Sequence, residues 1–163
     1  MKKRYAALIF CAIGLLLGSV TSEAKKKPSV TAESAIVMDV QSGAILYEKN
    51  IDKREYPASI TKVMTALVAI ENSSLSETVT YSRNAVTNLE SGASNIEIQP
   101  GEKLSMEDSL YAILLMSANE ACNGVAEHVA GSIDNFVAMM NQKAKELGCT
   151  GTNFANANGL WMS

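Results

Sequence analysis

The chain has 163 residues, of which 47% are hydrophobic, and its formal net charge is −3. This length suits one domain or a large piece of one, and the composition is sufficient for a hydrophobic core. No basic stripe is present in the sequence, which argues against a nucleic-acid-binding protein. We therefore expect the partner to be a small molecule or a polymer and not a nucleic acid.

The first 24 residues are predicted to be a secretory signal peptide. Three basic residues, Lys2 to Arg4, precede a mostly apolar run from Tyr5 to Leu17, and Ser22-Glu23-Ala24 offers small residues around a cleavage point. The run is short for a membrane span, and an uncleaved anchor is the alternative. Cleavage after Ala24 would place the protein in the cell envelope, at the outer face of the cytoplasmic membrane or in the periplasm. Membrane association is expected only through an uncleaved signal or a C-terminal anchor absent from this sequence.

Two cysteines, Cys122 and Cys149, follow this segment. In an exported protein they could pair, but two cysteines far apart do not define a disulfide framework. Two buried, small apolar residues are the favoured interpretation. No His or Cys clusters near either of them in the sequence, so we expect no metal site, and we expect no cofactor.

The predicted elements begin with a linker over residues 25–33. A β-hairpin is predicted from Ser34 to Asn50, because two apolar runs flank the turn residues Gln41-Ser42-Gly43. A charged loop ending in Pro57 then leads to a helix of about Ile60 to Glu71. The hairpin alone would be marginally stable, so it needs further strands or a helix against it.

The rest of the chain is predicted to be mostly helical. Thr78–Tyr81 and Ile96–Ile98 alternate like short strands, and Pro100-Gly101 marks a turn. Capping residues and apolar periodicity then predict helices that begin at Ser105, run from about Glu120 to Ala130, and run from a Ser132 cap to Leu147. A strand pair followed by a block of helices indicates an α+β fold with helices packed on a sheet.

Ser59 and Lys62 open the first predicted helix and lie three residues apart, which places them on one helix face. A serine becomes a nucleophile when a base takes its proton, and a desolvated amine could be that base. Lysine in a first turn also opposes the helix dipole, which suggests a functional reason for it. The spacing alone is weak evidence, since about one chance match is expected and Ser22-x-x-Lys25 also fits.

A second motif, Ser117-Ala118-Asn119, lies between two predicted helices. An ordinary helix link with a polar cap is the simpler interpretation, and Ser82-Arg83-Asn84 has the same spacing. Its position favours a functional interpretation, because both polar side chains would lie together at the end of an apolar helix. We therefore treat Ser117 and Asn119 as candidate site residues.

Together these motifs resemble the serine D-alanyl-D-alanine carboxypeptidases, the low-molecular-weight penicillin-binding proteins. Ser34–Gly43 resembles the first hairpin of that family, Tyr56–Thr65 its nucleophile segment and Leu115–Ala121 its second motif. Further matches continue in the family's order, so that the resemblance covers Ser34 to Leu160. It implies a β-lactamase/transpeptidase-like α+β fold in which residues 34–163 form part of the catalytic domain, after the signal peptide at 1–24 and the linker at 25–33.

The resemblance also implies a reaction and a role for each candidate residue. The reaction would be acyl transfer on a peptidoglycan stem peptide that ends in D-Ala-D-Ala, and β-lactam antibiotics would be covalent inhibitors. The implied residues are Ser59 as nucleophile, Lys62 as general base, Ser117 as proton relay and Asn119 in substrate binding.

Two departures from the family pattern matter. Asn158 stands where the family usually has a His before Gly-Leu, and the only His of the chain, His128, is interpreted as structural. The family's third motif, Lys-Thr-Gly, does not occur in the sequence. Since that motif would supply an oxyanion donor and bind the substrate carboxylate, we expect a chain truncated before it to be inactive, or nearly so, by itself. The alternatives are a serine β-lactamase-like hydrolase and a non-catalytic peptidoglycan-binding remnant.

Overall fold

The computed structural model describes residues 28–87, 89–90 and 92–160, and the predicted signal peptide lies outside them. The chain separates into two compact units between Lys53 and Arg54. The described part of the first unit is a β-hairpin, and the second unit contains the helices. That residues 34–163 form part of one catalytic domain remains a prediction.

The predicted hairpin is confirmed in the first unit. Strand β1 (Ala35–Met38) pairs antiparallel with β2 (Ile45–Lys49), and the register shifts between Val37 and Met38. Asp39 shapes the connection, because its carboxylate accepts hydrogen bonds from the Ser42 backbone N–H at 2.7 Å and from the Ser42 hydroxyl at 2.5 Å. These bonds hold the pKa of Asp39 below its ordinary value.

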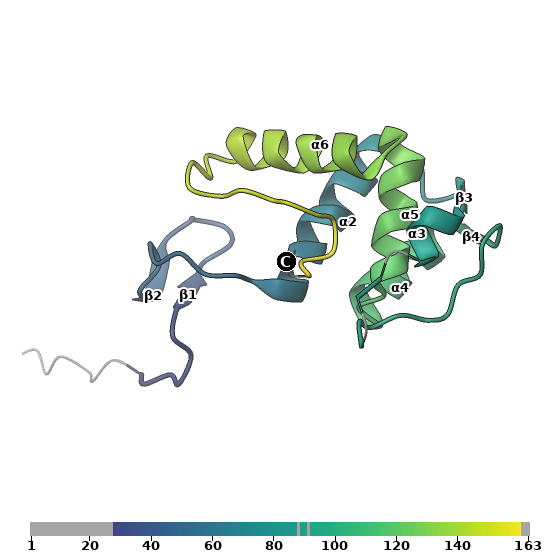
Figure 1. Cartoon of the computed structure of the whole chain (residues 1–163). Helices are drawn as coiled ribbons and strands as arrows, with labels where there is room; N and C mark the ends of the chain where they lie inside the picture. Colours follow the sequence, from purple (N-terminus) through teal and green to yellow (C-terminus); the bar gives the residue numbers. More distant parts are fainter. Residues whose placement is uncertain (1–27, 88, 91, 161–163) are drawn as a thin grey trace, which may run out of the picture. The chain divides into compact units, whose positions relative to one another are not determined.

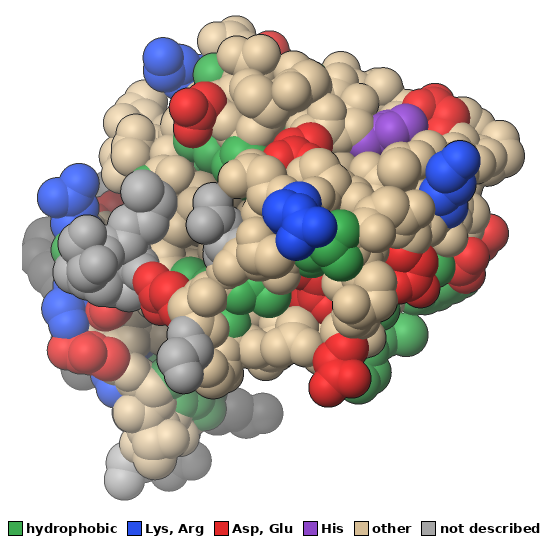
Figure 2. Space-filling view, turned by 45° about the vertical axis from the view of Figure 1, so that its right-hand side comes forward, with side chains coloured by type: hydrophobic (Ala, Val, Ile, Leu, Met, Phe, Trp, Pro, Cys, Tyr) green, Lys and Arg blue, Asp and Glu red, His purple; other side chains and the backbone are tan. Residues whose placement is uncertain are grey.

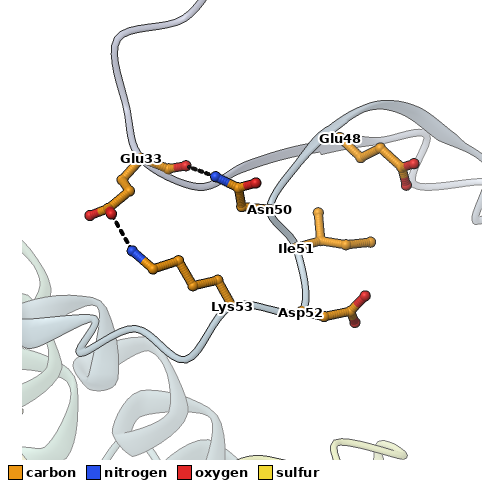
Figure 3. Close-up of a pocket in the computed structure, with 6 residues that line it drawn as sticks. All are labelled: Glu33, Glu48, Asn50, Ile51, Asp52 and Lys53. Carbon is orange, nitrogen blue, oxygen red and sulfur yellow. Dashed lines mark hydrogen bonds and ion pairs between the residues drawn. The ribbon is translucent and has the colours of Figure 1, made fainter.

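A pocket lies beside the hairpin in the same unit (Figure 3). Glu33 contributes its side chain to an ion pair with Lys53 and its backbone carbonyl to a 2.8 Å hydrogen bond from the Asn50 amide. The lining residues are polar except for one: Glu33, Glu48, Asn50, Ile51, Asp52 and Lys53. These bonds tie the start of the described chain to the end of β2.

The second unit begins with a 3-10 turn, η1 (Ala58–Ile60), which continues directly into helix α2 (Thr61–Asn72). Pro57 precedes the turn, where its fixed φ is compatible with a helix start. One face of α2 is buried, and this face carries Lys62, Thr65 and Ala69. The predicted helix from Ile60 to Glu71 is therefore present with its bounds shifted by one residue.

The second sheet differs from the prediction. Strand β3 (Thr78–Thr80) pairs antiparallel with β4 (Lys103–Ser105), and the predicted strand at Ile96–Ile98 does not form. The backbone near Ile96 is bonded to α5 instead, since the Ile96 N–H donates to Glu120 Oε1 at 2.6 Å. A short helix, α3 (Arg83–Thr87), follows β3 and was not predicted.

Three helices complete the unit. Helix α4 (Met106–Leu115) is capped by Ser105, whose hydroxyl accepts from the Asp108 N–H at 3.0 Å. Helix α5 (Asn119–Ala130) ends at Gly131 in the left-handed conformation, and α6 (Ile133–Glu146) is capped by Ser132. The predicted caps are confirmed: Ser105 and Ser132 cap through side-chain-to-backbone bonds, and Gly131 through its left-handed backbone and a bond from its N–H to the Glu127 carbonyl.

The core of this unit forms around α5, which packs against α2, α3, α4 and α6 (Figure 1). Tyr81 is fully buried there, and its hydroxyl donates to Ser109 Oγ at 2.8 Å. Its ring lies against Gly124, where an added Cβ would meet ring atoms at 2.3 Å. Burial raises the pKa of Tyr81 to about 12.

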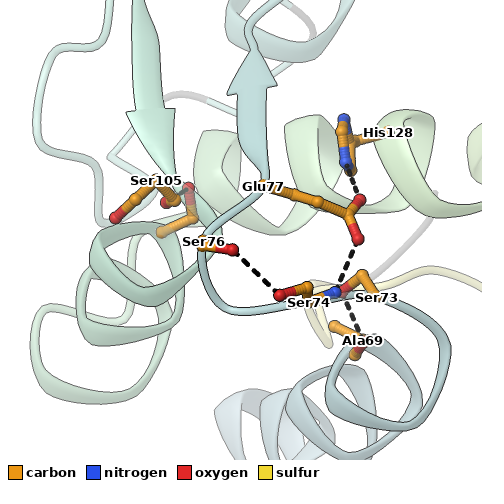
Figure 4. A network of polar contacts seen from close by, with 8 residues as sticks. Ala69, Ser73, Ser74, Ser76, Glu77, Ser105 and His128 are labelled. Carbon is orange, nitrogen blue, oxygen red and sulfur yellow. Dashed lines mark hydrogen bonds and ion pairs between the residues drawn. The ribbon is translucent and has the colours of Figure 1, made fainter.

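His128 lies in a polar network at the surface and not among the candidate site residues. Its Nε2 is 2.9 Å from Glu77 Oε2, and Glu77 also accepts from the Ser74 N–H at 2.6 Å (Figure 4). On the face that Figure 2 shows, basic and acidic side chains are interspersed, and the histidine lies beside an acidic side chain. The network connects the segment after α2 with α5.

The expectation of two buried cysteines is correct for Cys122 and wrong for Cys149. Both are free thiols, and Cys149 is exposed in the segment that follows α6. Cys122 has no exposed surface, and burial raises its pKa to about 12. Among the described residues, no helix is both long enough and apolar enough to cross a membrane.

Candidate active site

Ser59 lies in η1, immediately before α2, and its side chain is exposed. The residue before it, Ala58, has φ of 50°, a left-handed conformation that an alanine adopts at a cost. This turn presents the hydroxyl at the surface, and the chain becomes buried at Thr61 and Lys62. The hydroxyl is therefore reachable from solvent and rests on a fixed backbone.

Lys62, one helical turn later, is buried with 3% of its surface exposed. Its ammonium group has three hydrogen-bond acceptors: Ser59 Oγ at 3.3 Å, Asn119 Oδ1 at 2.8 Å and the Asn158 carbonyl at 2.8 Å. Desolvation by burial lowers the pKa of the Lys62 amine below its ordinary 10.5, and the nearby Cys122 thiol opposes this to a lesser extent. A lysine with a lowered pKa is a better proton acceptor near neutral pH.

Ser117 lies in the link between α4 and α5, with φ of 55°. Its hydroxyl donates to Ser59 Oγ at 3.0 Å. Ser117 and Ala58 are thus two non-glycine residues with left-handed backbone at one site. Strained backbone of this kind persists where the surrounding structure holds it, and it is found frequently at functional sites.

Asn119 is the first residue of α5 and is 2% exposed. Its Oδ1 accepts from Lys62, and its Nδ2 donates to the Ser94 carbonyl at 2.8 Å. The Asn119 backbone N–H donates to the same carbonyl at 2.9 Å. One hydrogen of the Asn119 amide group therefore has an assigned acceptor and the oxygen an assigned donor, so that the orientation of the side chain is determined.

The four candidate residues thus come together from two segments, 59–62 and 117–119, that lie far apart in the sequence. Among the described residues, the chance match Ser82-x-Asn84 does not join them. Ser22-x-x-Lys25 lies outside the described residues, and Ser82 and Asn84 both donate to the carboxylate of Glu127. Spatial convergence therefore separates Ser117-x-Asn119 from the chance match at Ser82-x-Asn84.

Residues 157–159 contribute to the site in a way that was not predicted. The Asn158 carbonyl accepts from Lys62, and the neighbouring Ala157 carbonyl accepts from Thr65 Oγ1 at 2.5 Å. Gly159 lies against the nucleophile turn, because an added Cβ would be 1.9 Å from the Ala58 carbonyl oxygen. The Gly159-Leu160 pair, which matches the family pattern, was the available sequence signal for this segment. No pattern in the sequence indicates that it packs against α2.

The hydrogen-bond geometry determines what Lys62 can do after it loses a proton. A neutral amine keeps two N–H donors and one lone pair. Asn119 Oδ1 and the Asn158 carbonyl accept hydrogen bonds only, and both lie at 2.8 Å. They retain the two N–H groups, so the lone pair faces Ser59 Oγ at 3.3 Å. This arrangement suits removal of the Ser59 proton.

Known proteins match this chain over most of its length. The family model described as D-alanyl-D-alanine carboxypeptidase, peptidase S11, matches residues 21–163. D-alanyl-D-alanine carboxypeptidase DacF of Bacillus subtilis is 36% identical over 97% of this chain and 43% of its own length. DacC of Escherichia coli is 37% identical over 82% of this chain and 35% of its own length. The chain therefore spans less than half the length of these relatives.

Solved structures confirm the predicted fold class. Penicillin-binding protein 6B from Escherichia coli is similar with a TM-score of 0.79 and 30% identity, covering 85% of this chain and 46% of that one. A D-alanyl-D-alanine carboxypeptidase from Mycobacterium tuberculosis gives a TM-score of 0.78 and 34% identity over 85% of this chain and 51% of that one. The chain belongs to the D-alanyl-D-alanine carboxypeptidase family, and its fold is the α+β fold of penicillin-binding proteins.

Proposed function

We propose that Ser59 is the nucleophile of a D-alanyl-D-alanine carboxypeptidase that acts through an acyl-enzyme. The observation that carries the proposal is the convergence of Lys62 and Ser117 on Ser59 Oγ, at 3.3 and 3.0 Å. A buried amine with a lowered pKa and a second hydroxyl at one serine form a nucleophile with its proton acceptor and a relay.

In the proposed reaction, Lys62, Ser117 and Asn119 assist the acylation of Ser59. Lys62 takes the proton of Ser59 Oγ as this oxygen bonds to the carbonyl carbon between the two D-alanine residues. The C–N bond then breaks, and a proton passes through Ser117 to the nitrogen of the leaving D-alanine. Water hydrolyses the ester and returns the proton to Ser59. Asn119 hydrogen-bonds the substrate amide in this proposal, through the N–H that Ser94 does not accept.

The proposed substrate is a peptidoglycan stem peptide ending in D-Ala-D-Ala, and the proposed inhibitors are β-lactams, which acylate the same serine. A cell-wall substrate requires export, so we propose that the signal peptide expected over residues 1–24 directs the protein to the cell envelope. The family membership supports both parts of this proposal.

Acylation by a fluorescent penicillin tests the function. The 163-residue chain is compared with a fusion in which its residues continue into the C-terminal part of DacF from Bacillus subtilis. We expect strong labelling of the fusion, weak labelling of the chain alone and no labelling of either Ser59→Ala variant. Mass spectrometry locates the adduct at Ser59. Absence of labelling in the fusion would overturn the proposed function, and strong labelling of the chain alone would overturn the expectation that it is inactive.

A further inference from the structure

Two side chains hold the turn at residues 156–160. Asn158 Oδ1 accepts from the Leu160 N–H at 2.9 Å. Asn156 makes more of the bonds: its Oδ1 accepts from the Gly159 N–H at 2.7 Å and from the Asn158 N–H at 3.2 Å. Its Nδ2 donates to the Leu160 carbonyl at 2.7 Å. Three backbone groups of the turn are thus bonded to a single amide, which sets the direction of the peptide groups between them.

This turn contacts the candidate active site at two points. The Asn158 carbonyl accepts from Lys62 Nζ at 2.8 Å, in a buried position. Gly159 lies against the Ala58 carbonyl, immediately before Ser59 in the chain. The turn therefore supports both the base and the nucleophile, and Asn156 acts on them through the backbone of the turn.

From these contacts we propose that Asn156 is a positioning residue, which holds the Asn158 carbonyl against Lys62 and so directs the Lys62 lone pair at Ser59. The inference rests on the proposed function of Lys62 as general base. Lys62 has two acceptors other than Ser59, and each retains one N–H of the neutral amine. When the Asn158 carbonyl turns away, one N–H is released and the lone pair is no longer directed at Ser59 Oγ.

Loss of this carbonyl also changes the proton affinity of Lys62. A carbonyl oxygen that accepts a hydrogen bond from an ammonium group stabilises the charged form. Lys62 is already desolvated, and the titratable group that acts on it from α5 is the Cys122 thiol. Removal of the acceptor while the site stays buried therefore lowers the pKa of Lys62 further. Entry of water into a loosened site would have the opposite effect.

The same segment offers a matched control. Asn141, on α6, donates its Nδ2 to the Phe154 carbonyl at 2.8 Å and accepts from the Phe154 N–H at 2.7 Å. Asn141→Ala thus removes side-chain-to-backbone bonds from the same segment without changing the turn at Lys62. Asn156→Asp is the conservative variant, because a carboxylate retains both acceptor bonds to the turn.

The first experiment measures the pKa of Lys62 by NMR in the full 163-residue chain labelled with ¹³C-lysine, and Lys62→Met assigns the signal. In Asn156→Ala we expect the pKa to fall by about half a unit or more, while Asn141→Ala leaves it unchanged. Asn156→Asp should show no fall. An unchanged pKa in Asn156→Ala, or a rise towards the ordinary lysine value, would overturn the proposal.

The second measurement is the rate of Ser59 acylation in the fusion with the DacF segment. We expect Asn156→Ala to slow acylation about tenfold or more, and Asn156→Asp and Asn141→Ala to remain near the unchanged protein. Equal slowing by Asn156→Ala and Asn141→Ala would show a general loss of stability and would contradict positioning. If the unchanged fusion is not acylated at all, the proposed function fails, and the NMR comparison still decides the role of Asn156.

Discussion

Lys62 Nζ donates a 2.8 Å hydrogen bond to Asn119 Oδ1, and this bond joins the first turn of α2 to the first residue of α5. Both side chains are almost fully buried. A buried ammonium group is stable only when hydrogen-bond acceptors surround it. The burial of Lys62 in the first motif therefore depends on Asn119 in the second motif. Substitution of one of these residues is therefore expected to affect the other motif as well.

Lys62→Met removes the proposed proton acceptor while keeping a side chain of similar length. We expect the acylation rate of Ser59 in the fusion to fall by about a hundredfold or more. A rate within a few-fold of the unchanged protein would contradict the role of Lys62 as base. Lys103→Met, at an exposed position in β4, is the control and should not alter the rate.

The lowered pKa of Lys62 also predicts how stability depends on pH. Between the lowered value in the folded chain and 10.5, the unfolded chain binds more protons at this residue, so its contribution to the free energy of unfolding rises with pH. Below this pH range the folded chain bears the full free-energy cost of burying the charged amine. As the pH rises through the range, Lys62 loses its proton and this cost decreases. Urea denaturation at several alkaline pH values should show this rise in the unchanged chain relative to Lys62→Met. Parallel curves for the two proteins would refute the prediction.

Gly159→Ala and Gly148→Ala form a matched pair of substitutions. Both glycines are left-handed, with φ of 83° and 79°, so alanine costs about 1 kcal/mol at either position. Only at Gly159 would the new Cβ meet another group, the Ala58 carbonyl at 1.9 Å, since nothing lies within 4 Å at Gly148. We expect Gly159→Ala to lose at least about 1 kcal/mol more in the free energy of unfolding. Equal losses in urea denaturation would show that the contact with Ala58 is unimportant.

Glu120 is buried next to Asn119, and its Oε1 accepts from the Ile96 N–H at 2.6 Å. Among the described residues, Oε2 has no hydrogen-bond partner. Glu120→Gln retains an acceptor for Ile96, whereas Glu120→Ala leaves that N–H without its acceptor, at a cost of about 1–3 kcal/mol. Hydrogen exchange at the Ile96 amide should therefore accelerate in Glu120→Ala and stay slow in Glu120→Gln. Fast exchange in both variants would mean that the carboxylate charge, and not the acceptor, holds this segment.

Tyr81→Phe tests the buried hydroxyl in the core. One of the five tyrosines should ionise only near pH 12 by ultraviolet absorbance, and this step should be absent in the variant. Since the unfolded chain ionises first, Tyr81 makes stability fall as pH rises from the ordinary 10 towards 12. At neutral pH the variant should lose only about 1 kcal/mol, because Ser109 still donates to the Ser105 carbonyl. An unchanged absorbance titration in the variant would show that the late step belongs to another tyrosine.

Local chemistry in the sequence determined helices α2, α4, α5 and α6, but not α3, and half of the candidate site. Ser105 and Ser132 cap helices through bonds that span three residues, and these caps could be predicted because their partners are close in the sequence. Ser59 and Lys62 likewise share a face because they are one helical turn apart. The position of Ser117 and Asn119 between two predicted helices made them candidates, although their spacing alone did not distinguish them from Ser82 and Asn84, and the family resemblance then implied their roles.

Tertiary structure decided what depends on distant partners. Thr78–Thr80 pairs with Lys103–Ser105 and not with Ile96–Ile98, because short alternating segments do not specify their own partner and the Ile96 backbone is bonded to Glu120. The bond from Lys62 to the Asn158 carbonyl spans 96 positions, and no local pattern encodes it. The sequence thus identified the proposed nucleophile and base, whereas packing of the C-terminal segment against α2 determines where the base points.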